Sequence, residues 1–197
     1  MDDVTGERAP AERGARGGTS DAYRSLIRNK AFRNLSLATF SSALGDWIGF
    51  LAIIALTAEI LGPTNAALFA VSGVMIARVV PSLLIAPVAG VFVDRWDRKR
   101  VLIYSDIGRG LVMVMIPFTN EVFTLVLATL VIEVMSSLFA PAKDAVFPTL
   151  VRSEDLVAAN QVNLLSTYGT LPISAALFSL MLVGAEAYAP AGSFGKR

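Results

Sequence analysis

The chain contains neither cysteine nor histidine. Without cysteine it can form no disulfide and no thiolate nucleophile, and without histidine it has no side chain whose ordinary pKa lies near neutral pH. Cys/His metal sites and histidine proton relays are excluded by the same absences. We therefore expect no resident metal and no cofactor, and any proton-handling role would fall to Asp or Glu.

Charge is also scarce, because only 17% of the 197 residues are charged while 54% are hydrophobic. A soluble domain averages about 25% charged and about 45–50% apolar residues. The apolar residues gather into five runs, and a helix needs about 20 residues, with about 17–25 common, to cross a bilayer. The sequence therefore predicts an all-α, polytopic transmembrane helix bundle over residues 23–185, with spans at 34–61, 66–93, 101–117, 122–140 and 163–183.

The two ends of the chain have a different composition. Residues 1–22 are rich in Gly, Ala and charged residues and lack the apolar core of a signal peptide. We predict a disordered cytoplasmic tail there. Residues 186–197 hold no sixth apolar run, and we expect them to form the extracytoplasmic tail of a truncated chain.

The distribution of basic residues predicts the orientation. Seven Lys/Arg residues precede the first span, four lie between the second and third, and two lie between the fourth and fifth. On the opposite side only Lys196 and Arg197 follow the last span. Short loops rich in Lys and Arg stay in the cytoplasm, so the N-terminus is predicted to be cytoplasmic. We therefore expect the chain to lie in a lipid bilayer, and we expect no nucleic-acid partner.

Three charged residues, Asp46, Arg78 and Glu133, fall near the middle of predicted spans. A charge at that depth costs about 2.5–3.5 kcal/mol on insertion scales, so it needs a partner or a function. One alternative is an interior ion pair that fixes helix packing, and the other is a role in substrate binding or proton coupling. If Arg78 pairs with one carboxylate, the other remains desolvated and able to take up a proton.

Ser, Thr and Asn recur at helical spacing on the first, fourth and fifth spans. Lipid offers them no hydrogen-bond partner, so these stripes must face the bundle or a wet cavity. They serve either as contacts between helices or as the lining of a cavity. The candidate cavity-lining residues are Thr39, Ser42, Thr129, Asn163, Thr167 and Thr170.

The third span has no polar stripe beyond Arg109. We predict that it is a supporting helix that faces lipid. Asp106 and Arg109 are placed near its cytoplasmic end, where their spacing of three residues allows a local ion pair.

The loop between the second and third spans carries the most specific motif. It contains Gly90, Asp94, Arg95, Arg98, Lys99 and Arg100. This pattern resembles the loop signature of the major facilitator superfamily, although Asp97 stands where that family more often has Gly. The later segments 139–142 and 147–151 resemble its drug-efflux branch, which includes macrolide pumps and the enterobactin exporter. The resemblance covers about residues 29–183.

This resemblance implies the N-terminal part of a twelve-helix exporter in the plasma membrane. Such a protein would exchange protons for a drug-like or siderophore-like small molecule by alternating access, and the missing C-terminal half would be a partner. The motif would latch the cytoplasmic sides of the two halves; the residues assigned to this gate are Gly90, Asp94, Arg95, Arg98, Lys99, Arg100, Asp106 and Arg109. Alternatively, the basic residues of the loop only anchor the topology on anionic lipid.

The odd number of spans favours a second hypothesis of another class. In that case the chain is a truncated, non-transporting membrane fragment that acts at most as an assembly or regulatory partner. An enzyme is not expected, because the sequence offers no nucleophile–base pair and no metal cluster.

Overall fold

The computed structural model describes residues 19–188, which form helices and turns. Five segments in this range are long and apolar enough to cross a membrane, which confirms the predicted all-α polytopic bundle: Lys30–Leu61, Asn65–Ile85, Arg98–Phe118, Val122–Leu150 and Ser153–Ala185. The helices are α1 (Thr19–Arg28), α2 (Lys30–Leu61), α3 (Asn65–Arg95), α4 (Arg98–Met115), α5 (Val122–Val146), α6 (Leu156–Tyr168) and α7 (Thr170–Tyr188).

Polar side chains cap the starts of three of these helices. Asn29 accepts hydrogen bonds from the backbone N–H groups of Ala31 and Phe32 at the start of α2, and Thr64 caps α3. Asp97 accepts one from the N–H of Arg100 and so begins α4. These caps satisfy N–H groups that have no partner inside the helix. The Asp97 cap places the start of α4 at Arg98, three residues before the predicted start of the third span.

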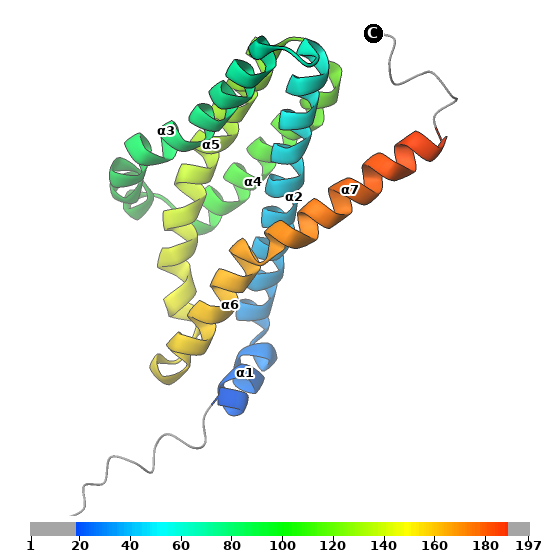
Figure 1. Cartoon of the computed structure of the whole chain (residues 1–197). Helices are drawn as coiled ribbons and strands as arrows, with labels where there is room; N and C mark the ends of the chain where they lie inside the picture. Colours follow the sequence, from blue (N-terminus) through cyan, green and yellow to red (C-terminus); the bar gives the residue numbers. More distant parts are fainter. Residues whose placement is uncertain (1–18, 189–197) are drawn as a thin grey trace, which may run out of the picture.

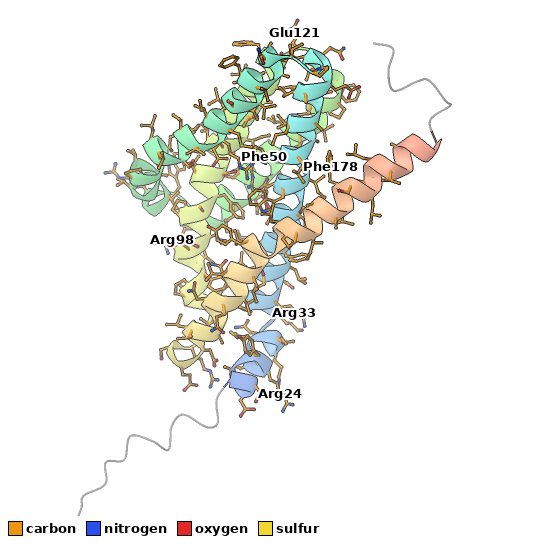
Figure 2. All side chains as sticks on the ribbon, viewed as in Figure 1. Arg24, Arg33, Phe50, Arg98, Glu121 and Phe178 are labelled. Carbon is orange, nitrogen blue, oxygen red and sulfur yellow. The ribbon has the colours of Figure 1, made fainter. Side chains whose placement is uncertain are left out.

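The helices α3, α4 and α5 pack together, and α2 lies against α3, α6 and α7 (Figure 1). Buried apolar side chains fill the middle of this bundle, among them Phe50, Ile53, Val74 and Leu125. Figure 2 shows Phe50 between the helices, with Arg24 and Arg33 at one end of the molecule and Glu121 at the other. Arg98, which is also labelled there, lies on one side of the bundle.

One face of α4 agrees with the predicted lipid-facing surface. Ile103, Ile107 and Leu111 recur every four residues and are exposed. The opposite face, with Ser105 and Arg109, is buried against the bundle. The helix therefore supports the bundle with one face and contributes polar groups to its interior with the other, which the sequence analysis did not predict.

The fifth span is made of two helices that meet at Gly169. The first part of α7 lies along α2, where Ser174 donates a hydrogen bond to the carbonyl of Leu44 at 3.3 Å. Beyond this contact α7 leaves the bundle, as Figure 1 shows. Its later apolar side chains, such as Leu180 and Met181, are exposed.

The short helix α1 packs against the connection between α5 and α6. Leu26 and Phe32 are buried together with Phe147 and Ala159, and the rings of Phe32 and Phe147 lie 5.2 Å apart. Residues 19–22, which the sequence analysis placed in the tail, form the start of this helix, and residues 186–188 belong to α7. The remaining parts of both predicted tails, 1–18 and 189–197, lie outside the described residues.

Hydrogen bonds hold α1 in this position, and one of them offers a test. Ser25 Oγ donates to the buried carboxylate of Asp155 at 3.1 Å. Replacing Ser25 with Ala removes a bond worth about 1 kcal/mol, so the amides of α1 should exchange with solvent about fivefold faster. Hydrogen exchange read by mass spectrometry measures this. Ser20→Ala, on the exposed side of the same helix, is the matched control, and equal exchange in both variants would contradict the expectation.

Candidate functional site

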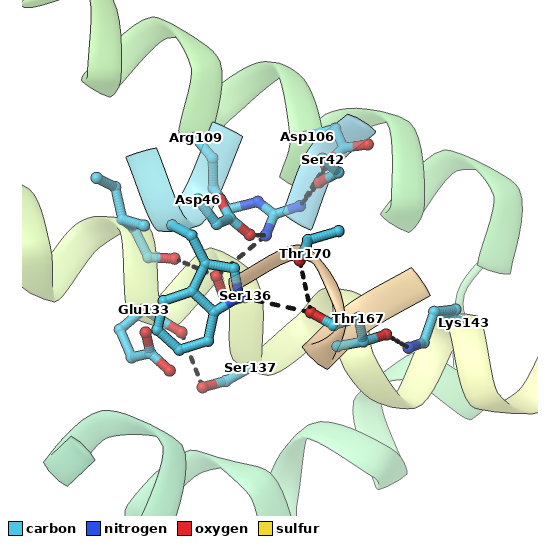
Figure 3. A network of polar contacts seen from close by, with 12 residues as sticks. Ser42, Asp46, Asp106, Arg109, Glu133, Ser136, Ser137, Lys143, Thr167 and Thr170 are labelled. Carbon is cyan, nitrogen blue, oxygen red and sulfur yellow. Dashed lines mark hydrogen bonds and ion pairs between the residues drawn. The ribbon is translucent and has the colours of Figure 1, made fainter. Parts of the chain in front are cut away.

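Arg109 of α4 is the centre of a polar network inside the bundle (Figure 3). It lies eleven residues after the start of α4 at Arg98, which at 1.5 Å per residue is about 16 Å along the helix, or half the thickness of a bilayer core. Only 4% of its surface is exposed. Arg109 therefore lies in the interior of the bundle, near the middle of the membrane-length segment Arg98–Phe118.

The Arg109 guanidinium joins three helices. Nη1 donates to the Asp46 carboxylate of α2 at 2.5 Å and to Ser136 Oγ of α5 at 3.3 Å. Nη2 donates to Ser42 Oγ of α2 at 2.7 Å and to the Asp106 carboxylate, one turn earlier in α4. We call Ser42, Asp46, Asp106, Arg109 and Ser136 the ionic cluster. The local pair between Asp106 and Arg109 is present as predicted, but it belongs to a larger arrangement.

The ionic cluster holds two carboxylates against one guanidinium. Ser42 Oγ also donates to Asp106 at 2.7 Å, and the guanidinium carbon lies 4.6 Å from the centre of the Phe139 ring. Its Nε is buried without a hydrogen-bond partner among the described residues. Because one cation serves both Asp46 and Asp106, a proton added to either carboxylate would remove the local excess of negative charge.

Arg78 of α3 rests on aromatic rings. Its guanidinium carbon lies 4.8 Å from the ring centre of Trp47 and 4.2 Å from that of Phe50, both on α2. None of the ion pairs among the described side chains includes Arg78. Arg78 was predicted to pair with Asp46 or Glu133. In the structure Asp46 pairs with Arg109, and Arg78 contacts the two aromatic rings through cation–π interactions.

Glu133 of α5 is half-buried and forms none of the ion pairs among the described side chains. Arg78 and Arg109 are the cations that act on it electrostatically. One turn further along α5, Ser137 Oγ donates to the backbone carbonyl of Glu133. Glu133 is therefore a carboxylate without an ion-pair partner next to a cationic interior.

The predicted polar stripes divide into two groups. Thr39, Thr129 and Thr170 are buried between helices, and Thr129 Oγ1 donates to its own helix at Leu125 O. Asn163 and Thr167 of α6 instead line a cavity of about 490 Å³ between α5 and α6. Thr167 also accepts, through its carbonyl, a hydrogen bond from Trp47 Nε1 at 3.5 Å.

The same cavity contains Lys143, which the sequence analysis assigned to a cytoplasmic connection. The predicted span ends at Ala140, but α5 continues through Pro141 to Val146. Lys143 is consequently a helical residue with a buried side chain, and its Nζ donates to Thr167 Oγ1 at 3.3 Å (Figure 3). Arg109 and Lys143 are the two basic residues whose surroundings the sequence did not reveal.

The residues assigned to the gate lie in separate places. Gly90 and Arg95 are in the last turns of α3, and Arg98, Lys99 and Arg100 form the first turn of α4. Asp106 and Arg109 belong to the ionic cluster. The side chain of Asp94 is not among those that the structure describes.

Two basic residues of the motif border a second cavity, of about 420 Å³. Arg95 and Arg100 line it together with Trp96 and Tyr104. Arg98 Nη1 donates to the carbonyl of Ala145 at the end of α5, at 3.3 Å. The motif thus joins the ends of α3, α4 and α5.

Five segments long enough to cross a membrane, with charged groups turned toward the interior of the bundle, are typical of a multi-pass membrane protein. Residues 22–188 match the family described as transmembrane secretion effector, a family of major facilitator (MFS) proteins, and the chain belongs to it. The predicted resemblance to the major facilitator superfamily is confirmed.

Curated relatives show the same kinship. The chain is 35% identical over 120 residues to the uncharacterized MFS-type transporter YfiS of Bacillus subtilis, covering 60% of this chain and 28% of the relative. It is 33% identical over 116 residues to BacE of the same organism, named as a candidate bacilysin exporter, covering 57% and 29%. An uncharacterized MFS-type transporter of Mycobacterium tuberculosis, Rv0037c, is 30% identical over 152 residues, covering 74% and 34%. The chain thus spans about a third of these relatives' length. No solved structure matches it.

Proposed function

We propose that this chain forms the N-terminal part of an exporter that moves a small molecule across the plasma membrane in exchange for protons, by alternating access. The N-terminus is on the cytoplasmic side in this proposal, as the distribution of basic residues indicates. The observation that carries it is the shared guanidinium of Arg109, which binds one carboxylate of α2 and one of α4 deep in the bundle.

A proton can act on this arrangement in a simple way. When Asp46 is ionised, its bond to Arg109 ties α2 to α4. When Asp46 takes up a proton it loses most of its attraction for the guanidinium, and Arg109 stays with Asp106 on its own helix. Proton uptake would thus loosen α2 from α4, and α2 also contacts α3, α6 and α7. Glu133 is the second candidate carboxylate because it has no ion-pair partner among the described residues.

The cargo in this proposal is a drug-like or siderophore-like small molecule. One relative is named as a candidate bacilysin exporter, which supports export as the direction of transport. Arg95 and its basic neighbours would serve as the gate at the cytoplasmic end, against the remainder of a longer transporter.

The test uses variants that keep the shape of the side chain and remove its charge. Asp46→Asn and Glu133→Gln should each lower proton release from everted membrane vesicles by about tenfold or more when cargo is added, because an amide cannot carry the proton. A pH-sensitive dye measures the release. Glu121→Gln, exposed at the end of the bundle, is the control. Unchanged proton release in both interior variants would remove the coupling role.

The alternative, a membrane fragment that assembles with other proteins and transports nothing, makes the opposite forecast. It gains support from the outer part of α7, where Leu180, Met181 and Val183 are exposed. Vesicles that contain the chain should then show no cargo-dependent proton release even without a substitution.

A further inference from the structure

The cavity between α5 and α6 has a polar wall built from two facing helices. Lys143 lies in the last turn of α5 and Phe147 begins the 3-10 turn that follows it, while Asn163 and Thr167 lie one turn apart on α6. With a volume of about 490 Å³ the cavity falls within the range of small-molecule sites, about 300–1,000 Å³. None of its polar residues belongs to the ionic cluster.

Lys143 is incompletely paired although it is buried. Its side chain is 9% exposed, and its ammonium offers three donors. One donor goes to Thr167 Oγ1 at 3.3 Å. The carboxylate of Asp144 lies 3.8 Å away, but that side chain is 64% exposed and faces water. A buried ammonium normally requires full hydrogen bonding and a counter-ion, so Lys143 has capacity for a further anionic partner.

A second group in the same wall lacks a partner. Asn163 Oδ1 is buried and forms no hydrogen bond with any described residue. Asn163 lies one turn from Thr167, so its amide and the Lys143 ammonium border the same space. Rotation of the amide can present either its oxygen or its NH₂ group. Two independent observations, an underpaired cation and an unpartnered amide, therefore point to a missing polar ligand.

We propose that this cavity binds the acidic group, a carboxylate or a phosphate, of the exported molecule, with Lys143 as its counter-ion; this inference rests on the proposed function. Asn163 supplies a neighbouring hydrogen bond through its NH₂ group, and Phe147 offers an apolar surface to the rest of the molecule. Thr167 positions the ammonium of Lys143, because its hydroxyl accepts from Lys143 and donates to the carbonyl of Asn163. The site is connected to the charged interior, because the carbonyl of Thr167 accepts from Trp47, whose ring holds Arg78.

A pair of dyes that differ only in the acidic group tests the proposal. Rhodamine 110 has a free carboxyl group, and rhodamine 123 is its methyl ester. With the protein in phosphatidylcholine nanodiscs, fluorescence anisotropy should give a dissociation constant about tenfold lower for the acid, the size expected of one charge-assisted hydrogen bond. The ratio should fall to about one in Lys143→Met and persist in Lys143→Arg and in Lys30→Met, whose lysine is exposed.

A second measurement does not depend on a variant. Sulfo-NHS-acetate acetylates accessible lysines, and peptide mass spectrometry reads the modification at Lys143. Rhodamine 110 should slow acetylation of Lys143 severalfold, whereas rhodamine 123 at the same occupancy should not. Equal protection by both dyes, or an acid preference that survives in Lys143→Met, would overturn the assignment.

The occupant and the function can be tested apart. If phosphatidylglycerol in the nanodisc displaces rhodamine 110 from Lys143, the acidic group belongs to a lipid and the assignment to cargo is wrong. If the acid preference depends on Lys143 but no proton-coupled transport occurs, the proposed function is wrong and the anion site remains supported. If both dyes are transported and Lys143→Met changes neither binding nor transport, the anion site is wrong and the proposed function remains.

Discussion

Replacing Arg109 with Met should destabilise the protein more than any other single loss of charge in the bundle. The substitution removes the only cation within 4.0 Å of Asp46 and Asp106 among the described side chains. Two neighbouring carboxylates are then left without their shared cation. Breaking a fully buried pair costs about 3–5 kcal/mol, and because the side chain of Asp106 is 38% exposed we expect a loss near the lower end of that range. Unfolding in bicelles followed by tryptophan fluorescence gives the free energy, and Arg95→Met, exposed at the end of α3, is the control.

Companion variants show whether charge or shape is responsible. Arg109→Lys keeps the charge but loses the planar guanidinium, whose two NH₂ groups contact α2 and α5 together. Its free energy of unfolding should therefore lie between those of wild type and Arg109→Met. Adding Asp46→Asn to Arg109→Met should recover part of the loss, because one unpaired carboxylate disappears. A double variant that is as unstable as the sum of the two single variants would mean that Asp46 and Arg109 do not interact.

The number of spans could be predicted because each one is a long and mostly apolar run, and a bilayer requires such a run of a helix that crosses it. The exposed face of α4 followed from the same pattern. The ends of the helices were less predictable. Asp97 starts α4 early by capping it, and Pro141 lies inside α5 instead of ending it. The side chains of Arg109 and Lys143 are buried in the bundle, which the sequence around them did not indicate.

Of the charge pairs in the interior, the sequence predicted the local pair between Asp106 and Arg109 but not the pair between helices. Asp46 and Arg109 are 63 positions apart, so nothing in the local pattern links them. Arg78 was the more obvious partner for Asp46 because it lies near the middle of its span. Its guanidinium instead lies against the rings of Trp47 and Phe50. A pattern of charges shows which groups need partners, and only the packing of α2 against α3 and α4 decides which partner each one finds.

Trp47→Ala should have an effect of similar size to the loss of Arg109, for a different reason. The indole packs against the apolar core, lies under the Arg78 guanidinium and donates to the carbonyl of Thr167. Removing a fully buried aromatic side chain costs about 3–5 kcal/mol. The indole of Trp47 is partly buried, so its packing loss should fall near the lower end of that range, and the lost cation–π contact adds about 1–2 kcal/mol. Trp47→Phe keeps a ring below Arg78 and should cost about 1 kcal/mol, mainly for the lost hydrogen bond.

The contribution of Arg78 can be isolated with a double-mutant cycle. Trp47→Ala and Arg78→Met together should be less damaging than the sum of the single variants, by about 1–2 kcal/mol, because each removes the same contact. Chemical unfolding in bicelles, followed by far-UV circular dichroism, reads all four proteins on one scale. Additive losses would show that Arg78 is held by something other than the ring of Trp47, and Trp47 would then matter only for packing and for its bond to Thr167.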